Sequence, residues 1–363
     1  MSPRVLTVVG NRPQFVKAAA VSGHLRERVE EVLVHTGQHY DPELSEVFFD
    51  ELGPPRPEHE LDVGSGSHAD QTAAILTRLE PLAAEIGPDA LLVYGDTNST
   101  LGGALVAAKS QLPLAHVEAG MRSGNREMPE EINRLVADSL SQLLLAPTET
   151  AMENLSREGL GERAVRTGDV MADVALRMGP VADERSEVLT RLGLEPRGFF
   201  VATAHRPANV DDPERLTLLI EVLSKAAELA PVVFPVHPRT RAGLESSGTL
   251  DGLGGRGIRT TEPLGYLDMT RLVRAARAVI TDSGGVQKES FLAAVPCLTM
   301  REETEWVETV ESGWNRLIGL RPDAVQGTLD ELPEPGEPSP AAEIYGGGEA
   351  GERVAAAMAD WLA

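Results

Sequence analysis

Short apolar runs alternate with longer amphipathic stretches along the whole chain. In the first half, the runs rich in Val, Leu and Ala predict buried strands. They cover residues 5–10, 30–37, 90–96, 112–120 and 143–148. Between them, residues 13–29 and 68–87 repeat apolar side chains with the period of a helix. Apolar strands that alternate with helices are typical of a parallel sheet covered on both faces.

The same pattern returns in the second half, after a polar segment. Residues 177–198 carry two prolines and several charges, which predicts a connection between two halves. Apolar runs resume at residues 199–205, 230–238, 257–263, 278–285 and 294–300. We therefore predict two doubly wound, Rossmann-like α/β domains, residues 1–176 and 195–346, that face each other across a cleft. The proline-rich stretch 331–340 predicts a loop, and residues 347–363 predict a terminal amphipathic helix.

Composition and charge narrow the classes of function. Apolar residues make up 42% of the chain and charged residues 25%, which is the balance of a globular protein with a core. No apolar run of about 18 residues and no signal-peptide pattern occurs, so we expect a cytoplasmic protein with no membrane partner. The formal net charge of −23 argues against nucleic acid as a partner. The single cysteine, Cys297, excludes an internal disulfide and a cysteine metal cluster, and its apolar neighbours predict a buried side chain.

Polar side chains follow the predicted strands, where open α/β sheets bind their ligands. After the first strand, Gly10 permits a sharp exit and Pro13 suits the first helical turn, whose N–H groups attract anions. Arg12 and Lys17 add positive charge for a phosphate. The alternative is a capping or surface role for Arg12 and a solvated Lys17.

Two carboxylates end neighbouring strands. Asp96 and Glu118 each close an apolar run, and Glu130, Glu131 and Arg134 follow soon after. A single carboxylate at a strand end can simply cap the next helix. Carboxylates near each other and near cations, however, differ in proton affinity, as general acid–base chemistry requires. A helix that begins in PEEINR places Glu130 and Arg134 four residues apart on one face, where an ordinary salt bridge is the alternative.

The strand over residues 278–285 ends in a glycine turn that predicts a diphosphate site. Ser283, Gly284 and Gly285 lie between this strand and the next helix, where backbone N–H groups form an anion nest. Glu289, one turn further on, is placed to accept hydrogen bonds from ribose hydroxyl groups.

Two histidines end two other strands of the second half. His205 precedes Arg206, and His237 lies close to Arg239. A lone histidine at a strand end is more often structural, but two of them beside arginines favour an anion pocket. We expect no metal, because the spacing matches no zinc pattern and nearby cations would repel one; no cofactor is expected either. A diphosphate site in one half and carboxylates in the other are the layout of a nucleotide-sugar enzyme.

A series of segments in one order resembles the non-hydrolysing UDP-N-acetylglucosamine 2-epimerase family, from about residue 4 to residue 358. The segments are GNRPQFVK, HTGQHYD, YGDTNST, HVEAGMRS, PEEINR, PTET, TGDVMAD, TAHR, PVHPRT, TDSGGVQKE and YGGGEA. The resemblance implies a two-domain fold of the GT-B type, shared with one class of glycosyltransferases. It further implies a terminal helix that packs back on the first domain, a UDP-sugar substrate and a homodimer.

The resemblance also implies roles for individual residues. The UDP moiety would be held by Arg12, Lys17, His205, Arg206, His237, Ser283, Gly284, Gly285 and Glu289. The sugar ring would be surrounded by Asp96, Glu118, Glu130 and Arg134. Loss of UDP would give a 2-acetamidoglucal, and return of UDP with protonation on the other face would invert C2. Asp96 is our first choice of base, Glu118 and Glu130 are alternatives, and His205 would stabilise the departing diphosphate.

Three segments depart from the common family pattern. They are Asn11-Arg12-Pro13-Gln14 after the first strand, Gln-His-Tyr-Asp at residues 38–41, where allosterically activated members have Gln-His-Arg, and Thr-Glu-Trp-Val-Glu at residues 304–308. The last two look like those of epimerases that act on diacetamido-glucuronate nucleotides, which are one alternative. A hydrolysing epimerase that releases N-acetylmannosamine and UDP, a glycosyltransferase, and a sugar-nucleotide binding protein without turnover are the others.

Overall fold

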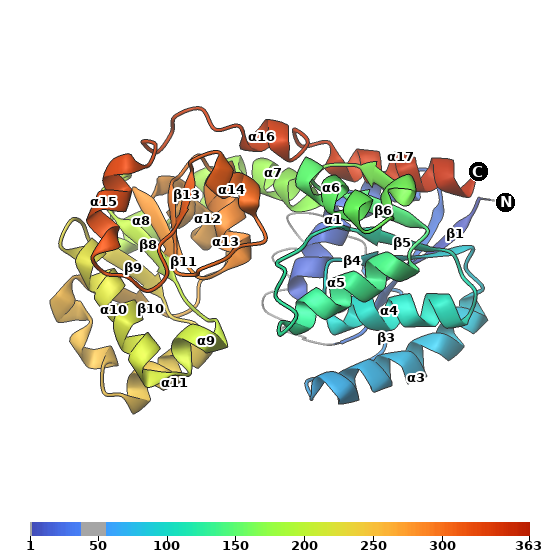
Figure 1. The fold of residues 1–363 in the computed structure, drawn as a ribbon, viewed down its shortest axis with the longest axis horizontal. Coiled ribbons are helices and arrows are strands. Elements are labelled where there is room, and N and C mark those ends of the chain that lie inside the picture. The colour runs from blue at the N-terminus through green and yellow to red at the C-terminus, as the bar shows by residue number, and fades with distance from the viewer. Residues whose placement is uncertain (1, 38–55) are drawn as a thin grey trace. The chain divides into compact units, whose positions relative to one another are not determined.

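The chain forms two compact units in the computed structural model, which describes residues 2–37 and 56–363 (Figure 1). One unit comprises Met1–Val174 with Glu343–Ala363, and the other comprises Ala175–Ala342. The segment 38–41, whose sequence departs from that of the allosterically activated relatives, lies outside the described residues, as does the side chain of Arg12. Each unit is built on its own parallel sheet.

The first unit contains a seven-stranded parallel sheet in the order β3-β2-β1-β4-β5-β6-β7. Its strands are β1 (Arg4–Val9), β2 (Glu30–His35), β3 (His59–Glu60), β4 (Ala90–Tyr94), β5 (Leu114–Val117), β6 (Leu143–Ala146) and β7 (Ala164–Arg166). Its helices are α1 (Arg12–Arg26), α3 (His68–Ile86), α4 (Asn98–Lys109), α5 (Pro129–Leu140), α6 (Glu149–Arg157) and α17 (Ala350–Leu362), with a 3₁₀ turn at Gly161–Arg163. The five strands predicted for this half are confirmed as β1, β2, β4, β5 and β6.

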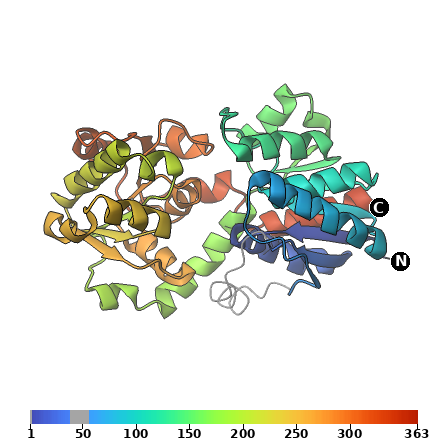
Figure 2. The ribbon, with the colours of Figure 1, turned by 90° about the horizontal axis from the view of Figure 1, so that it is seen from below.

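Two apolar layers cover the two faces of this sheet. On β1, Val5 and Val9 pack with α1 and α17, whereas Leu6 and Val8 pack with α3 and α4. This alternation follows from the pleat, which points successive side chains to opposite faces. Figures 1 and 2 show α17, in red, beside the blue helix α1. The last helix of the chain is thus part of the core formed by the first residues.

The second unit contains a six-stranded parallel sheet in the order β10-β9-β8-β11-β12-β13. Its strands are β8 (Phe200–Thr203), β9 (Val232–Pro235), β10 (Ile258–Thr261), β11 (Ala278–Thr281), β12 (Cys297–Thr299) and β13 (Asn315–Leu317). Its helices are α8 (Val188–Leu192), α9 (Pro207–Val210), α10 (Pro213–Ala227), α11 (Pro238–Ser246), α12 (Tyr266–Ala275), α13 (Gly284–Leu292), α14 (Val307–Glu311) and α15 (Ala324–Glu331), with 3₁₀ turns at Leu250–Gly252 and Gly254–Arg256. The predicted strands of the second half are confirmed, and so is the prediction of two doubly wound α/β halves.

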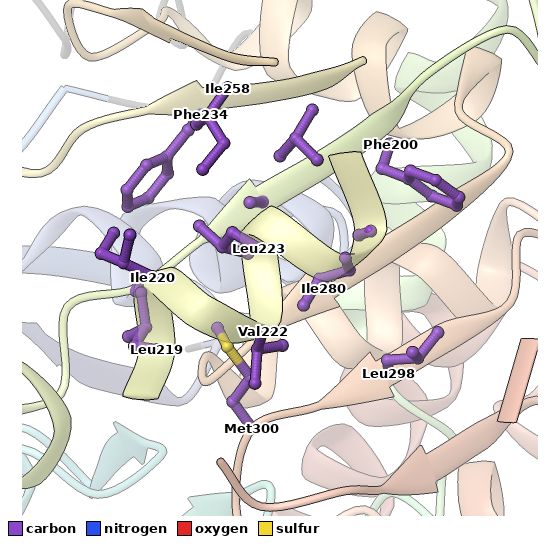
Figure 3. Packing of buried hydrophobic residues seen from close by; sticks show 14 of the residues in the cluster. Phe200, Leu219, Ile220, Val222, Leu223, Phe234, Ile258, Ile280, Leu298 and Met300 are labelled. Atoms are coloured by element: carbon purple, nitrogen blue, oxygen red, sulfur yellow. The ribbon is translucent and has the colours of Figure 1, made fainter. Parts of the chain in front are cut away.

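One face of the second sheet packs against α10. Figure 3 shows Leu219, Ile220 and Leu223 of this helix with Phe234 and Ile280 of the strands, all buried. The alternate residues of the same strands point to the opposite face, where they pack against α8 and α12. Both faces are covered, which explains why these strands read as continuous apolar runs.

The segment 177–198, predicted as a polar connection, is largely helical. Helix α7 (Val170–Arg185) contains Pro180 in its interior and is followed by α8. Val174, Met178 and Ala182 recur every four residues on α7 and are buried. Burial of this stripe outweighs the helix-breaking tendency of the proline, which costs about 3 kcal/mol.

Helix α17 approaches α1 so closely that a side chain at position 351 has no room. A Cβ atom on Gly351 would lie 2.0 Å from the Ala20 carbonyl oxygen, whereas a Cβ on Gly23 of α1 meets nothing within 4 Å. We expect Gly351→Ala to lower the free energy of unfolding by about 1–3 kcal/mol, because α17 must shift. The control Gly23→Ala should raise it by about 0.5–1 kcal/mol through helix propensity. Urea unfolding of both variants tests this, and equal stability of the two would contradict the packing.

Candidate functional site

Each sheet has one point at which its strand order reverses, and polar residues gather there. In the first sheet the reversal lies between β1 and β4, and in the second between β8 and β11. Helices leave the carboxyl ends of such a strand pair in opposite directions, so the loops between them form a natural ligand site. The site residues predicted from sequence follow these strands or their neighbours. They fall into one group in each unit.

In the first unit, Lys17 and Glu118 form an ion pair beneath the turn after β4. Lys17 Nζ donates to Glu118 Oε2, and both side chains are nearly buried. Burial alone would lower the pKa of Lys17, but the carboxylates of Glu118 and Asp96 raise it above its ordinary value. A Cβ atom on Gly95 would lie 2.9 Å from Lys17 Nζ and 3.2 Å from Glu118 Oε2. Glycine at position 95 therefore lets the Gly95–Asp96 turn pack directly on this pair.

Asp96 is held from α5 by an arginine. Arg134 donates to Asp96 Oδ2 from Nε at 3.0 Å and from Nη2 at 2.7 Å, and its Nη1 donates to Glu131 Oε2 at 2.7 Å. Glu131 is buried and also accepts from the backbone N–H groups of Ser123 and Gly124. Burial alone would raise the pKa of Glu131, but these donors and Arg134 lower it below its usual range. Arg134 thus bridges a buried carboxylate and the half-buried Asp96.

Glu118 has a left-handed backbone. Its φ is +71°, which is uncommon for a residue other than glycine. The N–H groups of Glu118 and Ala119 both donate to the Leu145 carbonyl oxygen, at 3.0 and 3.2 Å, and hold this turn. Backbone strain of this kind is tolerated where the surrounding structure fixes it, and it often marks functional sites.

In the second unit, the buried carboxylate of Asp282 organises the strand ends. It accepts from the backbone N–H of His205 at 3.1 Å, from that of Arg206 at 3.0 Å and from Asn209 Nδ2 at 3.2 Å. Arg206 Nε donates to the Asp282 carbonyl oxygen at 3.0 Å. Asp282 directly precedes Ser283, so this one residue joins the β8 and β11 ends. The loops after β8 and β11 are therefore in direct contact.

The two predicted histidines lie side by side at this edge. The rings of His205 and His237 have centroids 5.6 Å apart. The Nδ1 atom of His237 accepts from the Arg239 backbone N–H at 3.2 Å, and so caps α11. Desolvation, with nearby His205 and Arg239, lowers the pKa of His237 and favours a neutral ring. Arg239 itself pairs with Asp211 through two hydrogen bonds of 2.8 Å.

The glycine turn after β11 begins α13, as predicted. Ser283 is the N-cap residue, and Gly284 and Gly285 form the first turn. A Cβ atom on Gly284 would lie 2.1 Å from Glu305 Oε1, so any larger residue there would displace the Glu305 carboxylate. Glu305 pairs with Arg301 Nη2 at 2.9 Å and lies 3.8 Å from Arg206 Nη2. Burial alone would raise the pKa of Glu305, but Arg301 and Arg206 help lower it.

The remaining predicted residues lie near these groups. Glu289, on α13, lines a cavity of about 120 Å³ with Tyr266 and Thr270 of α12. Glu130 is exposed in the first turn of α5, which Pro129 begins as expected. The backbone of Arg12 begins α1.

Two absences hold for the described part of the chain. Residues 2–37 and 56–363 contain no group of three His, Cys, Asp or Glu side chains arranged to hold a metal ion. Over the same residues, no helix combines the length and apolar character that a membrane crossing requires.

Sequence reasoning missed several residues of these two groups. His116 lies on β5, two positions before Glu118, which is the spacing of side chains on one face of a strand. Asp138 lies on α5, four positions after Arg134, which is the spacing of side chains on one face of a helix. Asp282 and Glu305 lie beside residues that were identified. The periodicity signal was present for His116 and Asp138, but nothing in the sequence pairs them with each other.

The Lys17–Glu118 pair generates a stability prediction. Lys17→Met removes the ammonium from a nearly buried carboxylate, and we expect a loss of about 3 kcal/mol in the free energy of unfolding. Adding Glu118→Gln should recover part of this loss, because the uncompensated charge is then removed. The control Lys225→Met breaks the exposed pair with Glu228 and should cost less than about 1 kcal/mol. Urea unfolding of the wild type, Lys17→Met, Glu118→Gln and the double variant forms the cycle, and a coupling energy near zero would contradict a buried pair.

Known proteins with similar sequences cover almost the whole chain. The model of the family described as UDP-N-acetylglucosamine 2-epimerase matches residues 23–359. The UDP-2,3-diacetamido-2,3-dideoxy-D-glucuronate 2-epimerase of Pseudomonas aeruginosa is 44% identical, over 98% of this chain and 99% of that protein. The UDP-N-acetylglucosamine 2-epimerase of Methanocaldococcus jannaschii is 37% identical, over 96% of each chain.

The fold is similar to that of solved epimerases. The crystal structure of the Methanocaldococcus jannaschii UDP-GlcNAc 2-epimerase in complex with UDP-GlcNAc and UDP matches with a TM-score of 0.87 and 35% identity, over 98% of this chain and 99% of that chain. The match includes both parallel sheets and confirms the GT-B-like architecture. With the family model and relatives of this identity in agreement, the chain belongs to the UDP-N-acetylglucosamine 2-epimerase family of nucleotide-sugar isomerases.

Proposed function

We propose that this protein interconverts UDP-N-acetylglucosamine and UDP-N-acetylmannosamine by inverting C2 of the sugar. The observation that carries the proposal is the carboxylate group at the switch point of the first sheet. Asp96 and Glu118 lie there with Lys17 and Arg134 as charge partners, in a chain whose relatives bear the names of 2-epimerases. A proton must leave carbon in this reaction, and carboxylates fixed by cations are groups that can receive and return it.

The substrate's chemistry dictates the order of bond changes. The C2 hydrogen lies next to no carbonyl group, so its direct removal is unfavourable. When the C1–O bond to UDP breaks, the bonding electrons leave with the diphosphate and C1 becomes electron-deficient. A base then takes the C2 proton, and the C–H electrons form a C1=C2 double bond, which gives a 2-acetamidoglucal. Protonation of C2 from the other face and return of UDP to C1 complete the inversion.

We assign the proton step at C2 to Asp96, with Glu118 and Glu130 as the alternatives. Both hydrogen bonds from Arg134 fall on Asp96 Oδ2, so Oδ1 is the oxygen that we assign to the proton. The Asp96 side chain is 33% exposed, against 13% for Glu118. Asp96 therefore combines a fixed orientation with access to a ligand.

We assign the departing diphosphate to the second unit and to Arg12. The N–H groups at the start of α13, from Ser283 to Gly285, provide a partial positive charge for phosphate oxygens. His205 and Arg206 lie at the same strand edge, tied to Asp282. His237, beside His205, adds a ring N–H donor, and Glu289 on α13 serves the ribose hydroxyl groups. Such preorganised donors stabilise charge as it develops on the leaving group.

A second candidate substrate is UDP-2,3-diacetamido-2,3-dideoxy-glucuronate. The observation that favours it is the 44% identity with the Pseudomonas aeruginosa enzyme named for that sugar nucleotide. The segment 304–308, Thr-Glu-Trp-Val-Glu, supports the same candidate through its likeness to such epimerases. The C2 chemistry is the same for both substrates, so the proposed residues keep their roles. The homodimer and the cytoplasmic location stay predictions.

Turnover in heavy water tests both the reaction and the substrate. The protein is incubated with each UDP-sugar alone in deuterium oxide, and the products are separated and examined by mass spectrometry and proton NMR. We expect a C2 epimer that carries deuterium at C2, with UDP still attached to the sugar. Release of free sugar with UDP would identify a hydrolysing enzyme instead. Product without deuterium would exclude proton exchange at C2 and contradict the proposed mechanism.

Two matched variants separate the proton step from nucleotide binding. Asp96→Asn keeps the shape but removes basicity, so we expect turnover to fall by at least about 100-fold while UDP affinity is retained. Ser283→Ala removes a hydroxyl from the nest, so UDP affinity should fall by up to about ten-fold. Calorimetric titration and initial rates measure the two effects, with the exposed Ser246→Ala as a control. Normal turnover in Asp96→Asn, with a large loss in Glu118→Gln or Glu130→Gln, would move the base to that residue.

A further inference from the structure

His116 and Asp138 form a completely buried pair below the carboxylates of the first unit. Both side chains have no exposed area, and His116 Nδ1 lies 2.7 Å from Asp138 Oδ1. The other ring nitrogen, Nε2, lies 2.7 Å from the Gly95 carbonyl oxygen. The pair thus links β5 and α5 to the turn that carries Asp96.

Both partners of the His116 ring accept hydrogen bonds. A backbone carbonyl oxygen cannot donate, and an ionised carboxylate cannot donate either. Burial alone would raise the pKa of Asp138, but Arg122, whose Nη2 lies 2.7 Å from Asp138 Oδ2, helps lower it below its usual range, so this carboxylate is ionised. Each ring nitrogen must therefore carry a hydrogen, and a histidine with two N–H groups is a cation.

Asp138 does not depend on His116 alone for charge compensation. Its Oδ2 atom lies 2.7 Å from Arg122 Nη2 and accepts the Gly120 backbone N–H at 3.0 Å. Arg122 also pairs with Glu158 at 2.7 Å. The cationic ring therefore adds positive charge next to the backbone that supports the site, in addition to compensating Asp138.

The pair joins the two turns that carry the proposed acid–base groups. On one side, the Nε2–H of His116 holds the Gly95 carbonyl oxygen, one peptide before Asp96. On the other side, Asp138 holds the Gly120 N–H, two residues after the strained Glu118. Gly95 and Gly120 both have positive φ, +60° and +82°. Turns of this kind need external hydrogen bonds to stay in one conformation.

We propose that His116 is a positively charged positioning residue, which with Asp138 clamps the Gly95–Asp96 turn to the Glu118–Gly120 turn. The positioning part rests on the proposed function, because Asp96 and Glu118 are the groups to be aligned. The charge part does not rest on it. A displacement of about 1 Å in a reacting group can cost about 100-fold in rate, so a clamp of the backbone beside both carboxylates has catalytic consequences.

The charge of His116 is measured directly by ¹⁵N NMR of the wild-type protein at pH 8. Two protonated ring nitrogens and a neutral ring give distinct nitrogen shifts, and His116 is assigned by its absence from a His116→Gln sample. His35 is an internal reference, because burial, partly opposed by Asp62, lowers its pKa to about 4 and keeps its ring neutral. In the same spectrum, we expect the nitrogen shifts of a cationic ring for His116 and those of a neutral ring for His35. A neutral His116 would overturn the proposal.

Variants then test the positioning role. His116→Leu removes both donors, and we expect kcat to fall by about 100-fold. His116→Gln keeps a neutral donor that can reach the Gly95 carbonyl oxygen, so it should recover part of the loss and remain about ten-fold below wild type. Asp138→Asn should lower kcat as well and convert His116 to a neutral ring in the NMR spectrum. UDP affinity should stay within about three-fold in all of them, because the proposed nucleotide contacts are made elsewhere.

The exposed His24 supplies the matched control. His24→Leu and His24→Gln should leave kcat, UDP affinity and the thermal midpoint unchanged. A folded His116→Leu protein with wild-type kcat would overturn the clamp. If both His116 variants fail to fold, Asp138→Asn decides the question, because the ring whose nitrogen shifts change in that variant identifies His116 in the wild-type spectrum. If no UDP-sugar is turned over by the wild type, the proposed function fails, while the NMR experiment still reports whether the buried ring is charged.

Discussion

Charge compensation at the carboxyl edge of the first sheet is the constraint on which the rest of this site depends. Four acidic side chains lie there, and each has a basic partner within hydrogen-bonding distance. Three of them have little or no exposed area, and the fourth, Asp96, is held by the buried Arg134. The pairs are Lys17–Glu118, Arg134–Asp96, Arg134–Glu131, Arg122–Asp138 and His116–Asp138. A buried carboxylate without its partner would cost several kcal/mol, so the fold must deliver α1, β4, β5 and α5 together.

The second unit organises the site that we assign to the diphosphate by a different route. A single buried carboxylate, Asp282, is used to fix backbone N–H groups and one asparagine, rather than to face a ligand. The positive character of this edge then comes from the start of α13 and from Arg206, and the two histidines add ring N–H donors. Because these are mostly backbone groups and neutral or half-exposed side chains, the proposed diphosphate would bind here without a large cost of burying charge beforehand.

Local backbone geometry follows from the same packing. A Cβ atom at Gly95 or Gly284 would displace the charged ends of the side chains that lie against them. Glu118 adopts a left-handed φ although it is not glycine, and the β6 carbonyl group of Leu145 holds it there through two N–H donors. Contacts with elements that are distant in the sequence thus determine the conformation of these turns. The residue types within each turn only permit that conformation.

The apolar runs were sufficient to predict ten strands, five in each half, and the parallel character of both sheets, whereas the short strands β3, β7 and β13 were not predicted. This worked because burial on both faces of a parallel sheet leaves a continuous apolar signal that any single strand shows. The helical course of residues 177–198 was missed, because Pro180 and the charged positions mask the buried stripe of α7 until its packing is known.

The pairing of charges could not be predicted in this way. Lys17 was predicted to bind a phosphate, and that stays a prediction, but nothing in the sequence indicated that it lies against Glu118, 101 residues away in the chain. Glu130 was favoured over its neighbour, yet the neighbouring Glu131 points inward to Arg134 because of its angular position on α5. From residue type and spacing alone, one can predict which helix or strand carries a charged side chain and at which end of that element it lies. Which charges meet, and which remain exposed to receive a ligand, depends on how helices cross the sheet edge, and that is settled only when the whole core is packed.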